Sequence, residues 1–458
     1  MTENSALAII LAAGKGTRMK SDLPKVLHLL AGATLLTHVV EAARSAGLAR
    51  LAVVVGPGMD EVAAAAAATL DPKLAVFVQA EQLGTADAVK AARQALDKFD
   101  GQVLVLYGDT PLLRAETIAK VRSELESGAD IVVVGFETQN PAGYGRLLLD
   151  GRGRLIGIRE EKDASPDERA LTLCNSGIMG FRSGKTLLGL LGRVGNDNTK
   201  REFYLTDAVA LARGDGLEAR IVAADGGEVL GVNSRAEMAE AEALMQTRLR
   251  AKAMANGATL IAPETVFLSI DTEIGKDVVI EPHVVIGPRV RIEDGATIKS
   301  FCYMELSRIG QGATVGPFAR LRPGADLAKG AHVGNFVEIK QSEIGEGAKV
   351  NHLTYIGDTS VGARANVGAG SITCNYDGFD KHRTEIGADA FIGSNSSLVA
   401  PVKIGEGAYI GSGSVISKDV APDSLALTRA PQEERPGWAA KMRERRSRKP
   451  KSGGTKRT

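Results

Sequence analysis

Small residues and several cations follow the first apolar run of the chain. The segment reads LAAGKGTR at 11–18, and Lys25 stands a few residues further on. Glycine and alanine after a strand let backbone N–H groups approach a phosphate closely, and Arg18 and Lys25 add positive charge. The spacing matches neither GxGxxG nor GxxxxGKS/T, which argues against a dinucleotide fingerprint and a P-loop. A phosphate-binding turn of another kind is favoured over a turn without function.

An aspartate stands at the end of a second apolar run. Asp109 follows the run Val103–Leu106, with Gly108 directly before it. A carboxylate at this end of a strand suits Mg²⁺, which prefers oxygen ligands and phosphate partners, and a simple turn aspartate is the alternative. The segment QAEQLGT at 79–85 adds amides and a hydroxyl that could read the edge of a base. Each segment is ambiguous alone, but together they indicate nucleotide chemistry in the first half.

One of the six histidines stands where chemistry is favoured. His352 lies three residues before Tyr355, within a repeat that also carries the cations Arg322 and Lys340. A neutral imidazole can accept a proton near pH 7, although a lone histidine is more often structural. The polar segment 372–381 interrupts the same repeat, and a polar loop in a rigid array is more often functional than a tolerated insertion.

Short apolar runs alternate with helical segments in the first 230 residues. The runs read as buried strands and are Leu7–Leu11, Leu51–Val55, Leu74–Val78, Val103–Leu106 and Ile131–Val134. The helical segments between them include Leu35–Ala46, Ala86–Phe99 and Ala115–Glu126. This alternation predicts an α/β domain with a mostly parallel, Rossmann-like sheet that binds ligands at the carboxyl ends of its strands.

The second half has a different periodicity. The segment Ser234–Ala255 contains neither Gly nor Pro and predicts a long helical arm, with Ser234 and Glu237 as a capping box and Asn256-Gly257 as its end. From Ile274 to Ile416 an aliphatic residue then recurs about every six positions. A period of six is typical of hexapeptide repeats, which form a parallel β-helix with three units in each coil.

Composition excludes several classes of protein. The charged fraction is 24% and the hydrophobic fraction 44%, which excludes disorder of the whole chain. Cys174, Cys302 and Cys374 are odd in number and far apart, which argues against a disulfide framework or a zinc site and fits a reducing cytoplasm. The sequence has no run approaching the length of a membrane span and no signal peptide, so we expect a cytoplasmic protein without a membrane partner.

The C-terminal segment carries a concentrated positive charge. Ten Lys or Arg residues and one acid lie between Arg435 and Thr458. A solvated, disordered tail is the favoured interpretation, because the segment has no apolar period and a single Trp. A contact with nucleic acid or a membrane surface is the alternative, and we expect no nucleic-acid partner.

Together these motifs resemble the sugar-nucleotide pyrophosphorylases followed by a left-handed hexapeptide helix. In the first half they are LAAGKGTRM at 11–19, Pro24-Lys25, QAEQLGT at 79–85, LYGDTPLL at 106–113, GYGR at 143–146 and Asn175-Ser176-Gly177. In the second half they are RLRPGA at 320–325, HVGNFVEIK at 332–340, NHLTYIGD at 351–358, NVGAGSITCNYDG at 366–378 and APV at 400–402. To about Pro436 the chain is similar to the family of bifunctional enzymes that make UDP-N-acetylglucosamine.

The resemblance implies two reactions and four parts of the chain. Acetyl transfer from acetyl-CoA to glucosamine 1-phosphate precedes uridylyl transfer from UTP to N-acetylglucosamine 1-phosphate, which releases pyrophosphate and uses Mg²⁺. The implied parts are a uridylyltransferase domain at 1–233, a helical linker at 234–257, a β-helix acetyltransferase domain at 258–436 and the basic tail at 437–458. A homotrimer that acts on small-molecule substrates is also implied.

Carried over residue by residue, the resemblance implies a uridylyltransferase site with Asp109 and Asn233 as metal ligands. The residues expected to bind UTP or UDP-N-acetylglucosamine are Leu11, Ala12, Ala13, Gly14, Arg18, Lys25, Gln79, Gly84, Thr85, Tyr107, Gly108, Asp109, Gly145, Glu160, Asn175 and Asn233. Among them Gly145, Glu160 and Asn175 would meet the sugar.

The resemblance also implies an acetyltransferase site in which His352 is the general base. The residues expected to bind the sugar phosphate are Arg322, Lys340, Tyr355 and Asn366, and those expected to bind acetyl-CoA are Ala369, Asn375, Tyr376, Ser394, Ser412 and Arg429. The alternatives are a single-function sugar-1-phosphate nucleotidyltransferase with a regulatory β-helix, and a β-helix that serves only as an oligomerisation scaffold.

Overall fold

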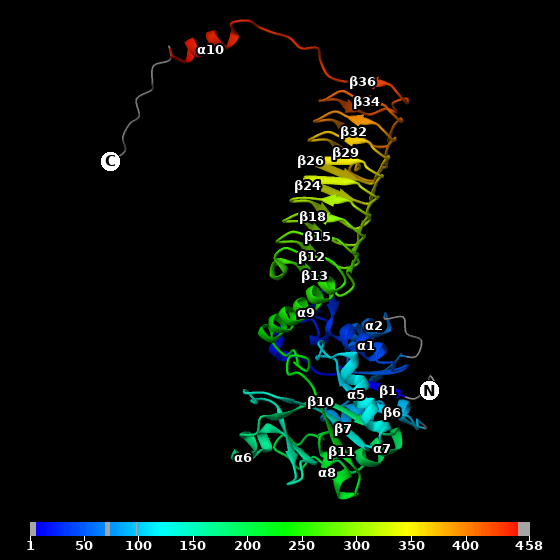
Figure 1. The fold of residues 1–458 in the computed structure, drawn as a ribbon, viewed down its shortest axis with the longest axis vertical. Coiled ribbons are helices and arrows are strands. Elements are labelled where there is room, and N and C mark those ends of the chain that lie inside the picture. The colour runs from blue at the N-terminus through cyan, green and yellow to red at the C-terminus, as the bar shows by residue number, and fades with distance from the viewer. Residues whose placement is uncertain (1–5, 69–73, 98, 448–458) are drawn as a thin grey trace, which may run out of the picture. The chain divides into compact units, whose positions relative to one another are not determined.

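The structure is a computed structural model that describes residues 6–68, 74–97 and 99–447 (Figure 1). The chain forms two compact units, Met1–Leu306 and Ser307–Thr458. The first unit holds an α/β domain, a long helix and the first coils of a β-helix, and the second unit holds further coils of the same kind.

A central sheet organises the α/β domain in the order β11-β7-β10-β6-β1-β4-β5. Its strands are β1 (Ala6–Leu11), β4 (Arg50–Val55), β5 (Leu74–Val78), β6 (Gln102–Tyr107), β7 (Ile131–Glu137), β10 (Leu173–Phe181) and β11 (Ala219–Ala223). β10 runs antiparallel to β6 and β7, and the other described pairs on this path are parallel. Leu11 pairs with Tyr107, so β1 and β6 end at the same edge. The predicted mostly parallel sheet is confirmed.

Residues of β1 alternate between two hydrophobic cores, one on each face of the sheet. Ala8 and Ile10 belong to one core, and Leu7 and Ile9 belong to the other. The first core is covered by α1 (Leu35–Ser45), α2 (Asp60–Ala67) and α5 (Ala115–Glu126). The second is covered by α3 (Thr85–Ala91), α4 (Arg93–Leu96), α7 (Gly184–Leu191) and α8 (Asp207–Gly214). Burial on both faces explains why the strands read as continuous apolar runs.

Two features of the α/β domain differ from the sequence prediction. The helix predicted over Ala86–Phe99 is divided at Ala92, where the N–H donates to Val89 O. Ala92 is fully buried, so packing against the sheet divides a segment of good helix formers. A hairpin of β8 (Gly145–Leu149) and β9 (Leu155–Arg159) also extends from β10 and was not predicted.

The predicted arm is helix α9 (Arg235–Ala255). Its N-cap is Ser234, whose hydroxyl oxygen accepts the Glu237 N–H, while the Glu237 carboxylate accepts the N–H of Asn233 at 2.8 Å. In the expected capping box the Glu237 carboxylate would accept the N–H of the N-cap residue Ser234, but here it accepts the N–H of the preceding residue, Asn233. Further along α9, the Gln246 side chain exchanges two buried hydrogen bonds with the backbone of Leu268 in the first coil.

The hexapeptide repeat forms coils of short parallel strands whose aliphatic residues stack inward at a spacing of one coil. In the first unit Ile280 pairs with Ile298, and in the second Val315, Val333 and Val350 form one ladder. The strands of the first unit's coils are β12 (Thr259–Leu260), β13 (Phe267–Leu268), β14 (Glu273–Ile274), β15 (Val279–Ile280), β16 (Val285–Ile286), β17 (Arg291–Ile292), β18 (Thr297–Ile298) and β19 (Tyr303–Met304). The predicted left-handed β-helix is confirmed as the fold of this half.

The second unit contains the longest strands of the β-helix. They are β24 (His332–Lys340) and β26 (Lys349–Gly357), which pair in parallel register. The other strands of this unit are β20 (Arg308–Ile309), β21 (Thr314–Val315), β22 (Arg320–Leu321), β23 (Ala325–Leu327), β25 (Ser342–Ile344), β27 (Thr359–Val361), β28 (Asn366–Val367), β29 (Ile372–Cys374), β30 (Thr384–Ile386), β31 (Phe391–Ile392), β32 (Ser397–Val399), β33 (Val402–Ile404), β34 (Tyr409–Ile410), β35 (Val415–Ile416) and β36 (Leu425–Ala426).

The interruption of the repeat is shorter than the sequence suggests. Ile372–Cys374 is strand β29 of a coil, so the loop itself begins at Asn375 and ends before β30. Phe379 at its tip is 91% exposed.

The C-terminal segment also differs from the predicted disordered tail. The structure places helix α10 (Trp438–Ser447) there, in a run of strong helix formers that follows Gly437. The rest of the predicted tail, 448–458, lies outside the described residues. Among the helices that the structure describes, none is long and apolar enough to cross a membrane.

Candidate active sites

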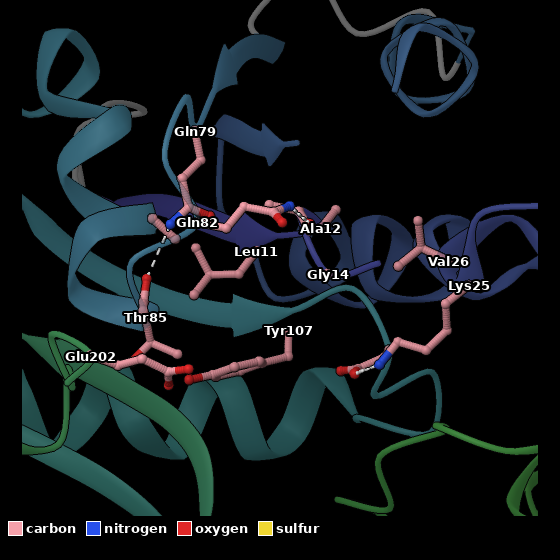
Figure 2. A pocket seen from close by; sticks show the side chains of 14 residues that line it. Leu11, Ala12, Gly14, Lys25, Val26, Gln79, Gln82, Thr85, Tyr107 and Glu202 are labelled. Atoms are coloured by element: carbon pink, nitrogen blue, oxygen red, sulfur yellow. Dashed lines mark hydrogen bonds and ion pairs between the residues drawn. The ribbon is translucent and has the colours of Figure 1, made fainter. Parts of the chain in front are cut away.

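A cavity of about 260 Å³ opens at the carboxyl ends of β1 and β6 (Figure 2). Most of the residues expected to bind the nucleotide line it: Leu11, Ala12, Ala13, Gly14, Lys25, Gln79, Gly84, Thr85, Tyr107 and Asp109. The parallel sheet brings these segments together because its strands end at one edge.

A second cavity of about 300 Å³ adjoins the first, and both are lined by Thr85, Tyr107 and Asp109. The residues expected to meet the sugar, Gly145, Glu160 and Asn175, line this second cavity together with Asn233. We call the first the nucleotide cavity and the second the sugar cavity, after the ligands that the sequence predicts for their linings. The shared wall would let two substrates meet at Asp109.

Two of the expected residues line neither cavity. Arg18 lies on an exposed single-turn helix, η1 (Thr17–Met19). Gly108 lies beneath the first cavity, where its N–H donates to Leu11 O at 2.9 Å and a Cβ would meet Val26 at 3.3 Å. The geometry therefore gives Gly108 a packing role between β1 and β6.

Two side-chain oxygens converge on one cationic nitrogen at the shared wall. The Lys25 ammonium donates to the Asp109 carboxylate and, at 2.9 Å, to Oδ1 of Asn233. The Val232 N–H donates to Asp109 O at 2.8 Å and so holds the residue after it beside β6. Carboxylate and amide oxygens that already surround a cation are a donor set that fits Mg²⁺.

Gly84 permits a close approach of two segments at the rim of the nucleotide cavity. Its φ is +120°, and a Cβ would lie 2.6 Å from Phe203 O. Next to it, the Ala86 N–H donates to the same oxygen, and Thr85 Oγ1 accepts the Leu205 N–H at 2.9 Å. The Gln79 amide donates to Gly84 O at 3.1 Å. These bonds fix the loop on which Gln79 and Thr85 face the cavity.

Burial changes the electrostatics of the sugar cavity. Desolvation raises the pKa of Glu160, and the Thr206 hydroxyl donates to that carboxylate at 3.1 Å. Burial, with the negative charges of Glu160 and Asp109 nearby, also raises the pKa of Tyr107. A phenol that stays protonated is a hydrogen-bond donor to oxygen atoms of a bound substrate.

The second candidate site lies on the long strands of the second unit. His352 on β26 pairs with Asn335 on β24, and its Nδ1 lies 2.6 Å from Asn335 Oδ1. With that oxygen as acceptor, Nδ1 carries the proton and Nε2 keeps its lone pair. His352 is exposed, so its ring is accessible to a substrate.

Several cations and polar groups gather near one another in the same unit. The nearby Lys381 ammonium is the main cause that lowers the pKa of Lys340, and burial and Arg322 act in the same direction. The Asn375 amide donates to the Asp358 carboxylate. A Cβ at Gly357 would meet both the Tyr355 hydroxyl and the Asn375 amide, so these two side chains cover the same point of the coil. Clustered cations of this kind suit a phosphate dianion.

Four of the six residues expected to bind acetyl-CoA form a column. Val367, Ile392 and Ile410 pair in successive coils, so Ala369, Ser394 and Ser412 occupy the same position two residues later. The Arg429 guanidinium donates to Ser412 O at 2.7 Å and extends this column.

Two other predicted residues lie outside this column. Asn366, expected to bind the sugar phosphate, lies on β28 and pairs with Lys349. Tyr376, expected to bind acetyl-CoA, is an exposed residue of the loop.

Comparisons with known proteins match both halves. The model of the MobA-like NTP transferase domain matches residues 8–169, and that of the bacterial transferase hexapeptide matches 271–305 and 383–418. The chain is also similar to the inositol-1-phosphate CTP transferase from T. maritima, with a TM-score of 0.41 and 17% identity over 51% of this chain and 91% of that chain.

Full-length relatives decide the family. "Bifunctional protein GlmU" from Bradyrhizobium sp. (strain ORS 278) is 55% identical, and that from Azorhizobium caulinodans (strain ORS 571) is 58% identical. In both cases the match covers 98% of this chain and 100% of the relative. The chain belongs to the GlmU family. It is therefore a bifunctional transferase, a uridylyltransferase and an acetyltransferase that together make UDP-N-acetylglucosamine, and a single-function nucleotidyltransferase is not favoured.

The geometry adds residues to which the sequence analysis gave no role of their own. Glu202 lines both cavities of the first unit, near Thr85 and Tyr107 (Figure 2). In the second unit Asn335 contacts His352, and Lys381 lies near Lys340. The sequence holds a signal for the last two, because Asn335 lies within the motif at 332–340 and Lys381 lies within the polar segment 372–381. Glu202 lies in an irregular segment without a pattern.

Proposed function

We propose that the paired cavities of the first unit carry out uridylyl transfer. UTP would occupy the nucleotide cavity, and N-acetylglucosamine 1-phosphate would occupy the sugar cavity beside Gly145, Glu160 and Asn175. A phosphate oxygen of the sugar attacks the α-phosphorus of UTP, a new P–O bond forms, and the bond to the leaving pyrophosphate breaks. The convergence of Asp109 and Asn233 oxygens at the shared wall is the observation that supports this assignment.

Asp109 and Asn233 would hold Mg²⁺. When bound, this ion would neutralise charge on the phosphates. Lys25, which contacts both oxygens, would supply a second positive charge to the phosphate chain. Tyr107 and Thr85, on the wall between the cavities, would orient the sugar phosphate toward the nucleotide.

We further propose that His352 is the general base of acetyl transfer. Its Nε2 takes a proton from the amine of glucosamine 1-phosphate, the nitrogen forms a bond to the acetyl carbon, and the C–S bond of acetyl-CoA breaks to release CoA. Arg322, Lys340, Tyr355 and Asn366 would bind the sugar phosphate. Ala369, Ser394, Ser412 and Arg429 would bind acetyl-CoA along the column that successive coils form, together with Asn375 and Tyr376 of the loop.

We propose a homotrimer formed through the β-helix. An apolar groove in the second unit is lined by Phe318, Phe336, Leu353, Tyr355 and Ile372, and the rings of Phe318 and Phe336 stack at 5.1 Å. Exposed apolar surface of this kind marks an interface, and a second copy of the chain would cover it.

We propose the domain boundaries 1–233, 234–257, 258–436 and 437–458, and a cytoplasmic location in which UTP and acetyl-CoA are available. The division into compact units falls after Leu306, within the repeat, and so differs from these boundaries.

Two assays of the purified protein test this function. Loss of the acetyl-CoA thioester should depend on glucosamine 1-phosphate, and release of pyrophosphate from UTP should depend on N-acetylglucosamine 1-phosphate and Mg²⁺. Thioester loss without pyrophosphate release, or the reverse, in the unmodified protein would contradict the proposal that the chain carries out both reactions.

A further inference from the structure

An arginine is buried next to the sugar cavity. Arg146 on β8 is only 1% exposed, although arginine is rarely buried unless it is paired. Its guanidinium donates from Nε to Leu171 O and from Nη2 to Arg169 O, both at 3.1 Å, and from Nη1 to Tyr144 O. The ion pair with Glu161 is longer, at 3.9 Å. Three backbone carbonyls therefore account for the hydrogen bonds of this buried cation.

The Tyr144 carbonyl belongs to a wall of the sugar cavity, and the Arg169 and Leu171 carbonyls belong to the segment that leads into β10, which contributes Asn175 to another wall. Tyr144 lines the cavity and is followed by Gly145, which also lines it. Leu171 lies shortly before Asn175, on the approach to β10. Within β8 and β10, Gly145 pairs with Asn175 and Arg146 pairs with Cys174. The guanidinium therefore links the segment before Gly145 to the segment before Asn175 through their backbone carbonyls.

Glu161 connects the same arginine to the third wall. One of its carboxylate oxygens accepts the Gly143 N–H at 2.7 Å, and the other faces Arg146. Glu161 directly follows Glu160, which lines the cavity. A shift of Arg146 would therefore act on Gly143, Gly145, Glu160 and Asn175 together.

We propose that Arg146 is a positioning residue for the sugar 1-phosphate, which fixes the walls of the sugar cavity without contacting the substrate. This inference rests on the proposed function, in which the second cavity binds the sugar. Only a planar guanidinium offers donors to three carbonyls in fixed directions, and a lysine ammonium cannot reproduce that geometry at the same depth.

The test compares the two substrates of uridylyl transfer in the full-length Arg146→Lys variant. We expect the KM for N-acetylglucosamine 1-phosphate to rise about 10- to 100-fold, since hydrogen bonds to a charged group are lost. The KM for UTP should stay within about twofold, because Gly143, Gly145, Glu160 and Asn175 line only the sugar cavity. A rise of both KM values by the same factor, or a sugar KM within twofold of wild type, would overturn the proposal.

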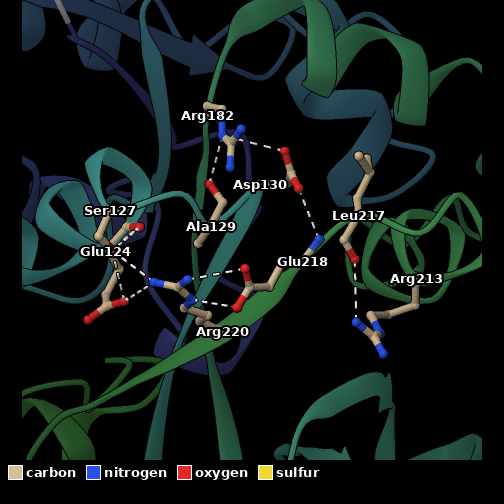
Figure 3. Close-up of polar contacts among 9 residues, drawn as sticks. All are labelled: Glu124, Ser127, Ala129, Asp130, Arg182, Arg213, Leu217, Glu218 and Arg220. Atoms are coloured by element: carbon tan, nitrogen blue, oxygen red, sulfur yellow. Dashed lines mark hydrogen bonds and ion pairs between the residues drawn. The ribbon is translucent and has the colours of Figure 1, made fainter.

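Arg220→Lys is the matched control (Figure 3). Arg220 donates to Glu218 at 2.8 Å and to Glu124 at 2.9 Å, at the amino end of β11 and away from the cavities. It also makes its ion pairs within the α/β domain, so its replacement should leave both KM values unchanged even where thermal stability falls. A sugar KM that rises equally in this control would assign the Arg146 effect to general destabilisation and overturn the proposal.

Two further variants keep the result decisive. If Arg146→Lys does not fold, Glu161→Gln is the deciding variant, because Glu161 is 35% exposed and its replacement is better tolerated. This variant should raise the sugar KM by severalfold, and an unchanged sugar KM would overturn the proposal. Asn175→Ala tests the underlying function separately. An unchanged sugar KM in Asn175→Ala would refute sugar binding in this cavity, whereas a raised value with normal kinetics in Arg146→Lys would refute only the role of Arg146.

Discussion

The hydrogen bond between Asn335 and His352 gives a graded test of the proposed base. The Asn335→Ala variant removes the acceptor of the Nδ1 proton, 2.6 Å away, and leaves the imidazole in place. A neutral hydrogen bond contributes about 0.5–1.5 kcal/mol, which corresponds to a loss of roughly 2- to 13-fold in the rate of acetyl transfer. The His352→Ala variant removes the base itself, and general-base catalysis contributes about 10²- to 10⁴-fold.

The order of these two losses is the prediction. Release of free CoA, measured with saturating acetyl-CoA and glucosamine 1-phosphate, should fall modestly in Asn335→Ala and by at least about a hundredfold in His352→Ala. The double variant should be no slower than His352→Ala, because the hydrogen bond acts only through the imidazole. Acetyl transfer by His352→Ala within threefold of wild type would show that the histidine is structural and that another group is the base.

Three further predictions concern the first unit. Asp109→Asn should abolish most uridylyl transfer at limiting Mg²⁺ and leave acetyl transfer intact, and normal pyrophosphate release at low Mg²⁺ would refute a metal ligand at this position. Gly84→Ala should raise the KM for UTP and lower the melting temperature, because its Cβ would lie 2.6 Å from Phe203 O; unchanged values would show that the loop relaxes. Burial raises the pKa of Glu160, so ionisation of this carboxyl destabilises the folded state as the pH rises above the ordinary pKa of 4.5. Glu160→Gln should therefore raise the melting temperature at pH 7 but not at pH 4. An equal effect at both pH values would contradict this.

Periodicity made the β-helix predictable from sequence. An inward aliphatic residue such as Val333 must recur at every turn of the coil, so the spacing itself reports the fold. The strands of the α/β domain were equally predictable, because burial on both faces of the sheet makes them continuous apolar runs. The division of the predicted helix at Ala92 could not be predicted, because packing at this buried residue overrides the helix propensity of the segment. Helix α10 lies in a segment whose charge favoured a disordered tail, although its residues favour a helix.

The candidate sites were predictable where residues lie in compact motifs at strand ends. Asp109 and Lys25 belong to such motifs, and the structure brings them into contact. Glu202 and Arg146 depend on contacts between segments far apart in the chain, and residue type alone does not reveal these. Arg18 stays a prediction, since it lies on the exposed η1 turn and lines neither cavity.

The central claim is that one chain carries two chemically independent active sites in two units. Its most direct test is to measure both half-reactions on the same preparations of Asp109→Asn and His352→Ala. We predict that Asp109→Asn loses uridylyl transfer and keeps acetyl transfer, that His352→Ala shows the reverse, and that a mixture of the two variants converts glucosamine 1-phosphate to UDP-N-acetylglucosamine. Loss of both activities in either correctly folded variant would contradict the claim.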